Sequence, residues 1–216
     1  MDVSTALLPT WLTIAAALGW SAVVWRALRA VAAQRSHPSP HLLGAVAVSV
    51  ALMWAMSVTP IPGFSVHLLG GALATWLLGA PLALLAVSAA ALLNVGFGTL
   101  SWEAAPVQAL LQGVRPVLVA RGCLTLAERL PRGNLFVYLL GVAFFGTAAA
   151  VTAGTAASVG LGSLLGATNP GLPWIALVPI AYAEAFITGA LTTIFVLYRP
   201  QWVATFEDAR WFGSRS

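Results

Sequence analysis

The chain has 216 residues, of which 60% are hydrophobic and only 7% are charged, and its formal net charge is +4. Ordinary globular domains carry about a quarter charged residues, so this composition excludes a soluble protein with a charged surface around its core. The charge comes from ten Arg residues set against six carboxylates, and Arg residues beside hydrophobic spans need no nucleic acid to explain them. We expect one integral membrane domain over residues 1–216, an all-α bundle of transmembrane helices.

The chain opens without the features of a cleaved signal peptide. Met1-Asp2-Val3 leads to Pro9 with neither a basic leader nor a small-residue cleavage site, so we expect the first span to be retained.

Seven apolar runs then follow, judged against the ~20 residues that a spanning helix needs. They are Pro9–Ala33, Leu42–Val58, Phe64–Leu78, Pro81–Val95, Pro106–Leu126, Leu135–Gly160 and Pro173–Leu197.

The region from Phe64 to Val95 leaves two alternatives. It forms either two short helices with a break at Gly79-Ala80-Pro81 or one long bent helix, because Pro removes a helical hydrogen bond. Seven spans place all three basic clusters on one side, which is then cytoplasmic, whereas six spans separate the first cluster from the others. We therefore predict seven spans, with the N-terminus outside and the C-terminus in the cytoplasm. The clusters are Arg26, Arg29 and Arg35; Arg121, Arg129 and Arg132; and Arg199, Arg210 and Arg215.

This topology puts three polar groups on the outer side: Asp2, His67 and Glu103. The connections Ser57–Gly63 and Gly96–Thr99 on the same side are rich in turn-forming residues. Irregular backbone at membrane depth is tolerated only where protein buries it or where it lines a cavity. We expect a shallow outward-facing pocket in which these groups converge.

Common catalytic motifs are absent from the sequence, which contains no phosphate-binding loop, GxSxG, HExxH or CxxC. We therefore do not expect an enzyme. The Gly-rich stretches Gly141–Gly146 and Gly154–Gly162 lie inside apolar spans, where small residues favour close helix packing over a ligand role. Cys123, the single cysteine, lies in an apolar stretch and is expected to pack in the core.

His67 has two possible roles, since it either bonds to a backbone carbonyl at a helix start or binds a metal ion. His37 and His41 flank Pro38 and Pro40 in a basic connection, so we expect both to be solvated loop residues.

Glu184 lies near the middle of the last span, where an ionised carboxylate needs a partner. Arg115, within the fifth span, is the candidate partner because it lies at a similar depth in the membrane. The positions of the two residues favour a structural Arg115–Glu184 ion pair and a transport role for Glu184 equally.

The segment 198–216 mixes aromatic residues with charges of both signs directly after a span. This composition is typical of a cytoplasmic interfacial helix, whose Trp and Phe side chains lie at the level of the lipid headgroups. The alternative is a docking segment for a partner protein.

Several segments together resemble the CbiM/NikM family, the substrate-capture subunits of energy-coupling factor transporters for cobalt and nickel, and especially a shorter bacterial branch of it. The resemblance covers most of the chain and depends on the order and spacing of the segments. They are Ser65-Val66-His67-Leu68-Leu69-Gly70-Gly71 with Leu77-Leu78-Gly79, Asn134-Leu135-Phe136-Val137-Tyr138 with Phe144-Phe145-Gly146, Glu184-Ala185-Phe186-Ile187-Thr188-Gly189, and Tyr198-Arg199-Pro200-Gln201-Trp202-Val203-Ala204-Thr205-Phe206.

The resemblance implies seven helices, a bacterial plasma membrane location and a site for a divalent transition metal, carried as substrate with no tightly bound cofactor. In the family the metal is held by the N-terminal amine and backbone, a His at position two and a second His, which His67 matches. Met1, Asp2 and His67 would then be the metal-binding residues here. The implied partners are a transmembrane coupling subunit and cytoplasmic ATPases, while the chain itself has no nucleotide site.

Position two departs from the family pattern, because it is Asp2 and not His. A site that exchanges an imidazole for a carboxylate becomes harder, which disfavours Ni²⁺ and Cu²⁺ relative to the family's site. The Asp2 departure supports a second hypothesis, in which the chain is a non-transporting scaffold or assembly subunit that has lost the metal site. A third is import of a small organic substrate in a pocket lined by Trp54, Trp76 and Trp102.

Overall fold

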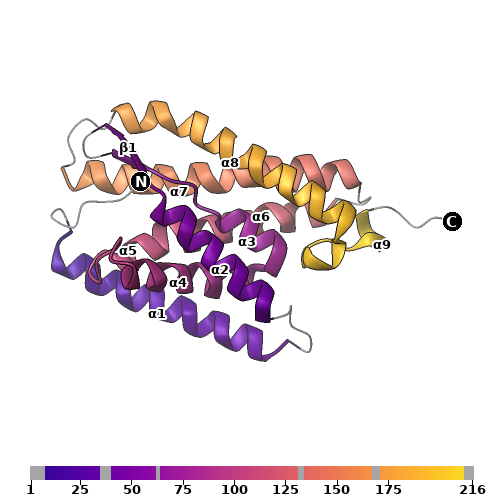
Figure 1. Cartoon of the computed structure of the whole chain (residues 1–216), viewed down its shortest axis with the longest axis horizontal. Helices are drawn as coiled ribbons and strands as arrows, with labels where there is room; N and C mark the ends of the chain where they lie inside the picture. The colour runs from indigo at the N-terminus through magenta and orange to yellow at the C-terminus, as the bar shows by residue number, and fades with distance from the viewer. Residues whose placement is uncertain (1–7, 35–39, 62–63, 131–133, 167–170, 212–216) are drawn as a thin grey trace.

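A computed structural model describes residues 8–34, 40–61, 64–130, 134–166 and 171–211 of the chain. Apart from one two-stranded hairpin, the elements of this described part are helices (Figure 1). In chain order they are α1 Thr10–Ala32, α2 Pro40–Ala55, β1 Val58–Ile61, β2 Phe64–Val66, α3 Gly71–Leu78, α4 Ala80–Gly96, α5 Ala105–Gln108, η2 Ala109–Val114, α6 Arg115–Glu128, η3 Val137–Gly146, α7 Thr147–Leu164, α8 Gly171–Tyr198, η4 Pro200–Trp202 and α9 Asp208–Trp211.

Among the described residues, seven helical segments make up the bundle, which confirms the predicted all-α transmembrane fold. The segments α5, η2 and α6 form one continuous helix of 24 residues, and η3 and α7 form another of 28. These two, α1 and α8 are the four helices in the described residues that are long and apolar enough to cross a membrane. Helices α2 and α4 are shorter, with 16 and 17 residues.

The break predicted at Gly79 is present, so the two-helix alternative is correct. Helix α3 ends at Leu78 and α4 begins at Ala80. Between them Gly79 has a φ of 75°, a left-handed conformation that residues with a side chain rarely adopt. Pro81 follows in the first turn of α4, where its missing N–H costs no helical hydrogen bond.

The predicted bounds of the second and third helices are wrong. Helix α2 ends at Ala55 instead of reaching Val58, and α3 begins only at Gly71. The residues between form the antiparallel hairpin of β1 and β2, in which Val58 lies opposite Val66. Helix α3 has eight residues and is about 12 Å long, so it cannot span the ~30 Å hydrocarbon core alone.

Helix α3 lies inside the bundle and contacts α4, α6, α7 and α8. Its Trp76 is fully buried and donates from Nε1 to Thr147 Oγ1 over 3.2 Å. Small residues permit this packing: a Cβ added to Gly154 would approach Leu69 Cδ1 to 3.0 Å, and one added to Gly146 would approach Cys123 Cβ to 3.3 Å. The packing role is confirmed for these two glycines, whereas Gly160 faces open space.

The described part of the tail forms two short turns, η4 and α9, and not one interfacial helix. It folds back onto the bundle, where Phe206 and Trp211 flank the ring of Tyr138 at centroid distances of 5.0 and 5.2 Å. Trp211 is 2% exposed. The aromatic residues that suggested lipid headgroup contacts are therefore partly protein core.

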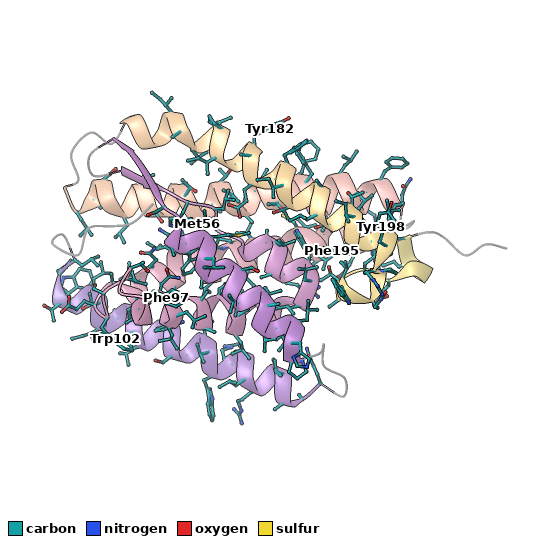
Figure 2. All side chains as sticks on the ribbon, in the orientation of Figure 1. Met56, Phe97, Trp102, Tyr182, Phe195 and Tyr198 are labelled. Carbon is teal, nitrogen blue, oxygen red and sulfur yellow. The ribbon has the colours of Figure 1, made fainter. Side chains whose placement is uncertain are left out.

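The bundle has two ends, which we name by what they carry. The hairpin end carries β1, β2 and the turn with Phe97 and Trp102, and the tail end carries Tyr198, η4 and α9 (Figures 1 and 2). A cavity of about 510 Å³ at the tail end is lined by Gln34, Arg121, Glu128 and Arg210. Residues that follow α1, that lie near the end of α6 and that belong to the tail thus line the same cavity. The seven-span prediction requires this, because it places all three segments on one side of the membrane. The assignment of this end to the cytoplasm remains a prediction.

Candidate functional site

His67 lies in the connection between β2 and α3, and its side chain is 6% exposed. Its Nδ1 is 3.1 Å from the carbonyl oxygen of Leu68. A carbonyl only accepts, so this contact requires a proton on Nδ1, and in the neutral imidazole the lone pair is then on Nε2. A neutral imidazole in this tautomer can bind a metal ion through Nε2.

The backbone that follows His67 is held by a carboxylate from the last long helix. Glu184 Oε2 accepts the Leu69 N–H at 2.7 Å, and Oε1 accepts the Gly70 N–H at 2.8 Å. Trp54 Nε1 donates to the Leu69 carbonyl oxygen at 2.9 Å. Because Glu184 lies halfway along α8, these non-helical residues lie at membrane depth, where backbone polar groups must find protein partners. Glu184 and Trp54 provide them.

The charge of Glu184 also suits the start of α3. Gly70 is the N-cap of this helix, so the carboxylate faces the positive end of the helix dipole. Gly70 has a φ of 68°, and a Cβ there would lie 3.1 Å from Val50 Cγ2 and 3.2 Å from Met53 Sδ. The backbone conformation therefore favours glycine at this position, and a Cβ would also require these two side chains to shift.

The ion pair considered between Arg115 and Glu184 is not formed. Glu184 is 2% exposed, and both of its carboxylate oxygens bond to backbone amides. Arg115 is exposed and lines a groove between α1 and α7 instead. The pair was predicted from the depth of the two residues alone, because residue types do not show that the amides of Leu69 and Gly70 would bond to Glu184.

The other predicted metal-binding residues, Met1 and Asp2, lie outside the described residues, as does His37. Glu103 is exposed in the turn before α5, and His41 is exposed at the start of α2, at the opposite end of that helix from Trp54. Within the described ranges, no group of three or more His, Cys, Asp and Glu side chains could hold a metal ion. His67 is thus the one predicted metal-binding residue that lies among the described residues.

Trp54 is a site residue whose role the sequence did not reveal. Besides its bond to Leu69, its ring lies 6.2 Å from the His67 ring, at an interplanar angle of 52°. The other two tryptophans of the suggested organic-substrate pocket are elsewhere: Trp76 is bonded to Thr147, and Trp102 is 72% exposed. The three indoles therefore do not line one pocket.

Comparison with known proteins places the chain in a family. The sequence model of a family described as "Cobalt uptake substrate-specific transmembrane region" matches residues 3–202. No curated protein and no solved structure matches the chain.

Proposed function

The chain belongs to the family of cobalt uptake substrate-specific transmembrane regions, and from this premise we propose that it is the membrane-embedded substrate-binding subunit of an energy-coupling factor importer. Its substrate would be a divalent transition-metal cation, cobalt or nickel. The observation that carries the proposal is the buried His67, whose Nδ1 lies against a carbonyl oxygen, so that Nε2 is the ring nitrogen through which a neutral imidazole would bind a metal.

Two further groups support a preformed site around His67. The Glu184 carboxylate and the Trp54 indole fix both the amide and the carbonyl of Leu69, two residues from the imidazole. A ligand that is held before binding loses less conformational entropy when the metal arrives. We propose that the N-terminal amine of Met1 and the Asp2 carboxylate complete the site from the start of the chain.

The proposed importer needs partners, since the chain has no nucleotide-binding motif. We propose a transmembrane coupling subunit and cytoplasmic ATPases in the bacterial plasma membrane, with the hairpin end outside and the tail end in the cytoplasm. The chain itself would capture the cation and carry out no reaction.

Metal titration of the purified full-length protein tests the proposal. Co²⁺ and Ni²⁺ are titrated into the wild type, His67→Ala, Asp2→Ala and the matched control His41→Ala, whose imidazole is exposed at the start of α2. We expect His67→Ala to abolish binding, Asp2→Ala to weaken it and His41→Ala to leave it unchanged.

The scaffold hypothesis makes the opposite prediction, and the departure at Asp2 is the observation that favours it. A wild-type protein that binds neither ion, together with unchanged cellular cobalt and nickel contents in a His67→Ala strain, would overturn the importer proposal. Asp2→His separates the two hypotheses further, because it would restore a nitrogen-rich site if the surrounding geometry has been retained.

A further inference from the structure

A groove of about 560 Å³ runs between α1 and α7, with η2 as its floor. Figure 1 shows α1 at one edge of the bundle, with the α5–η2–α6 helix between it and α7. The walls are apolar and contain small residues, including Ala15, Ala157 and Gly160. A Cβ added to Gly160 would meet no atom within 4 Å, so the groove is open there.

Arg115 is the charged residue among those that line this groove. It is exposed, and none of the described side chains or carbonyls forms a hydrogen bond or ion pair with it. The carboxylate at comparable depth, Glu184, is already bonded to Leu69 and Gly70. A guanidinium in the hydrocarbon region is costly unless an anionic group or water accompanies it.

We propose that this groove is the docking site for a transmembrane helix of another protein, and that this helix carries a carboxylate that pairs with Arg115. The small residues of the walls allow a helix to approach closely, and Arg115 provides charge complementarity for an acidic side chain. The contact does not need the metal site, so its test is independent of the proposed metal binding.

The depth of Arg115 favours a helix-borne carboxylate over a lipid phosphate. Arg115 follows Ala105, the first residue of the continuous helix, by ten positions, which corresponds to about 15 Å along the axis. This is half of the ~30 Å hydrocarbon core, so the Arg115 backbone lies near the membrane midplane. Lipid phosphates lie beyond the hydrocarbon boundary, whereas a carboxylate on a partner helix can occupy any depth.

Model transmembrane peptides test the docking site directly. The full-length protein is reconstituted in phosphatidylcholine nanodiscs, with a donor fluorophore on Leu164→Cys in a Cys123→Ala background; Leu164 lines the groove and is 86% exposed. Energy transfer is measured to poly-leucine helices that carry one central Glu, Gln or Lys and an acceptor dye. We expect the Glu peptide to associate about tenfold more tightly than the Gln peptide, in line with polar contacts between membrane helices.

The Arg115 variants decide whether the guanidinium causes this preference. Arg115→Leu should abolish the preference for the Glu peptide over the Gln peptide, and Arg115→Lys should keep it. Arg115→Glu should instead make the Lys peptide the one that associates most tightly. Arg121→Leu is the matched control, because Arg121 lies on the same helix but pairs with Glu128 at the tail end. Equal association of the Glu and Gln peptides with the wild type would overturn the proposal. So would a preference that disappears when phosphatidylglycerol is added, which would assign the groove to anionic lipid.

Discussion

Glu184 and Leu69 are 115 positions apart in the chain, yet the carboxylate Oε2 of one accepts the amide of the other at 2.7 Å. The second carboxylate oxygen accepts the next amide, that of Gly70. The last long helix therefore fixes the backbone just after His67. This makes Glu184 a positioning residue for the proposed metal-binding imidazole, although it lies on a different helix.

Removing the Glu184 carboxylate should destabilise the protein and weaken metal binding. Glu184→Ala leaves two buried amides without acceptors, at about 1–3 kcal/mol each, whereas Glu184→Gln keeps one acceptor oxygen and should cost less. Thermal unfolding in detergent and Co²⁺ titration measure the two effects. The control is Glu103→Gln, which changes an exposed carboxylate; equal losses in the Glu103 and Glu184 variants would contradict the positioning role.

Arg115 and Glu184 should behave as independent residues. Neither is a partner of the other, so the changes in unfolding free energy for Arg115→Leu and Glu184→Gln should add within about 0.5 kcal/mol in the double variant. Reversible unfolding in a denaturing detergent gives all three values. A double variant clearly more stable than this sum would show that the two charges interact.

Trp54→Phe should weaken the site while keeping an aromatic ring beside His67. The substitution removes the indole N–H that bonds to the Leu69 carbonyl and leaves that carbonyl unpaired, at a cost of about 1 kcal/mol. We expect a lower melting temperature and a weaker affinity for Co²⁺. Trp102→Phe is the matched change at an exposed position and should alter neither quantity.

Thr205→Val should destabilise the tail end without changing metal affinity. The Thr205 hydroxyl donates to the Trp76 carbonyl oxygen at 2.9 Å and accepts from the Tyr138 hydroxyl at 2.8 Å. Valine leaves the buried Tyr138 hydroxyl without this partner, at about 1–3 kcal/mol. Thr125→Val is the control, because Thr125 bonds only within its own exposed helical turn. A large loss of Co²⁺ affinity in Thr205→Val would show that the two ends are coupled.

The predicted orientation is tested by cysteine labelling in a Cys123→Ala background. Trp102→Cys at the hairpin end should react with a membrane-impermeant maleimide in intact cells, whereas Gln201→Cys at the tail end should react only after permeabilisation. Both positions are exposed, so access to the thiol is limited by the membrane. The reverse pattern would invert the topology and place His67 toward the cytoplasm.

Hydrophobic runs and charge placement predicted most of the helical arrangement. They gave seven helical segments and the break at Gly79, because length, composition and proline position act locally. The hairpin between α2 and α3 was missed, since Val58 and Phe64–Val66 are apolar enough to read as parts of neighbouring spans. Pairing between strands is a contact that composition does not encode.

The site was predicted less completely than the fold. His67 was identified by residue type and position, but its supports were not, because a backbone amide carries no signature in the sequence. Glu184 was rightly recognised as needing a partner. Its partner was sought among side chains, whereas the carboxylate bonds to the backbone amides of Leu69 and Gly70, just before α3. A carboxylate within a span can therefore indicate an interrupted helix elsewhere in the bundle.

The short helix α3 depends on residues that are synthesised long after it. Glu184 bonds to the amides at its start, and the amides of Thr205 and Ala204 bond to the carbonyl oxygens of Trp76 and Leu77 at its end. While the ribosome is still producing α4 to α7, neither end has these partners, and free backbone groups are costly in lipid. We expect α3 and the His67 connection to reach their final places only after α8 and the tail have emerged, so capture of a cation would be the last property that the growing chain acquires.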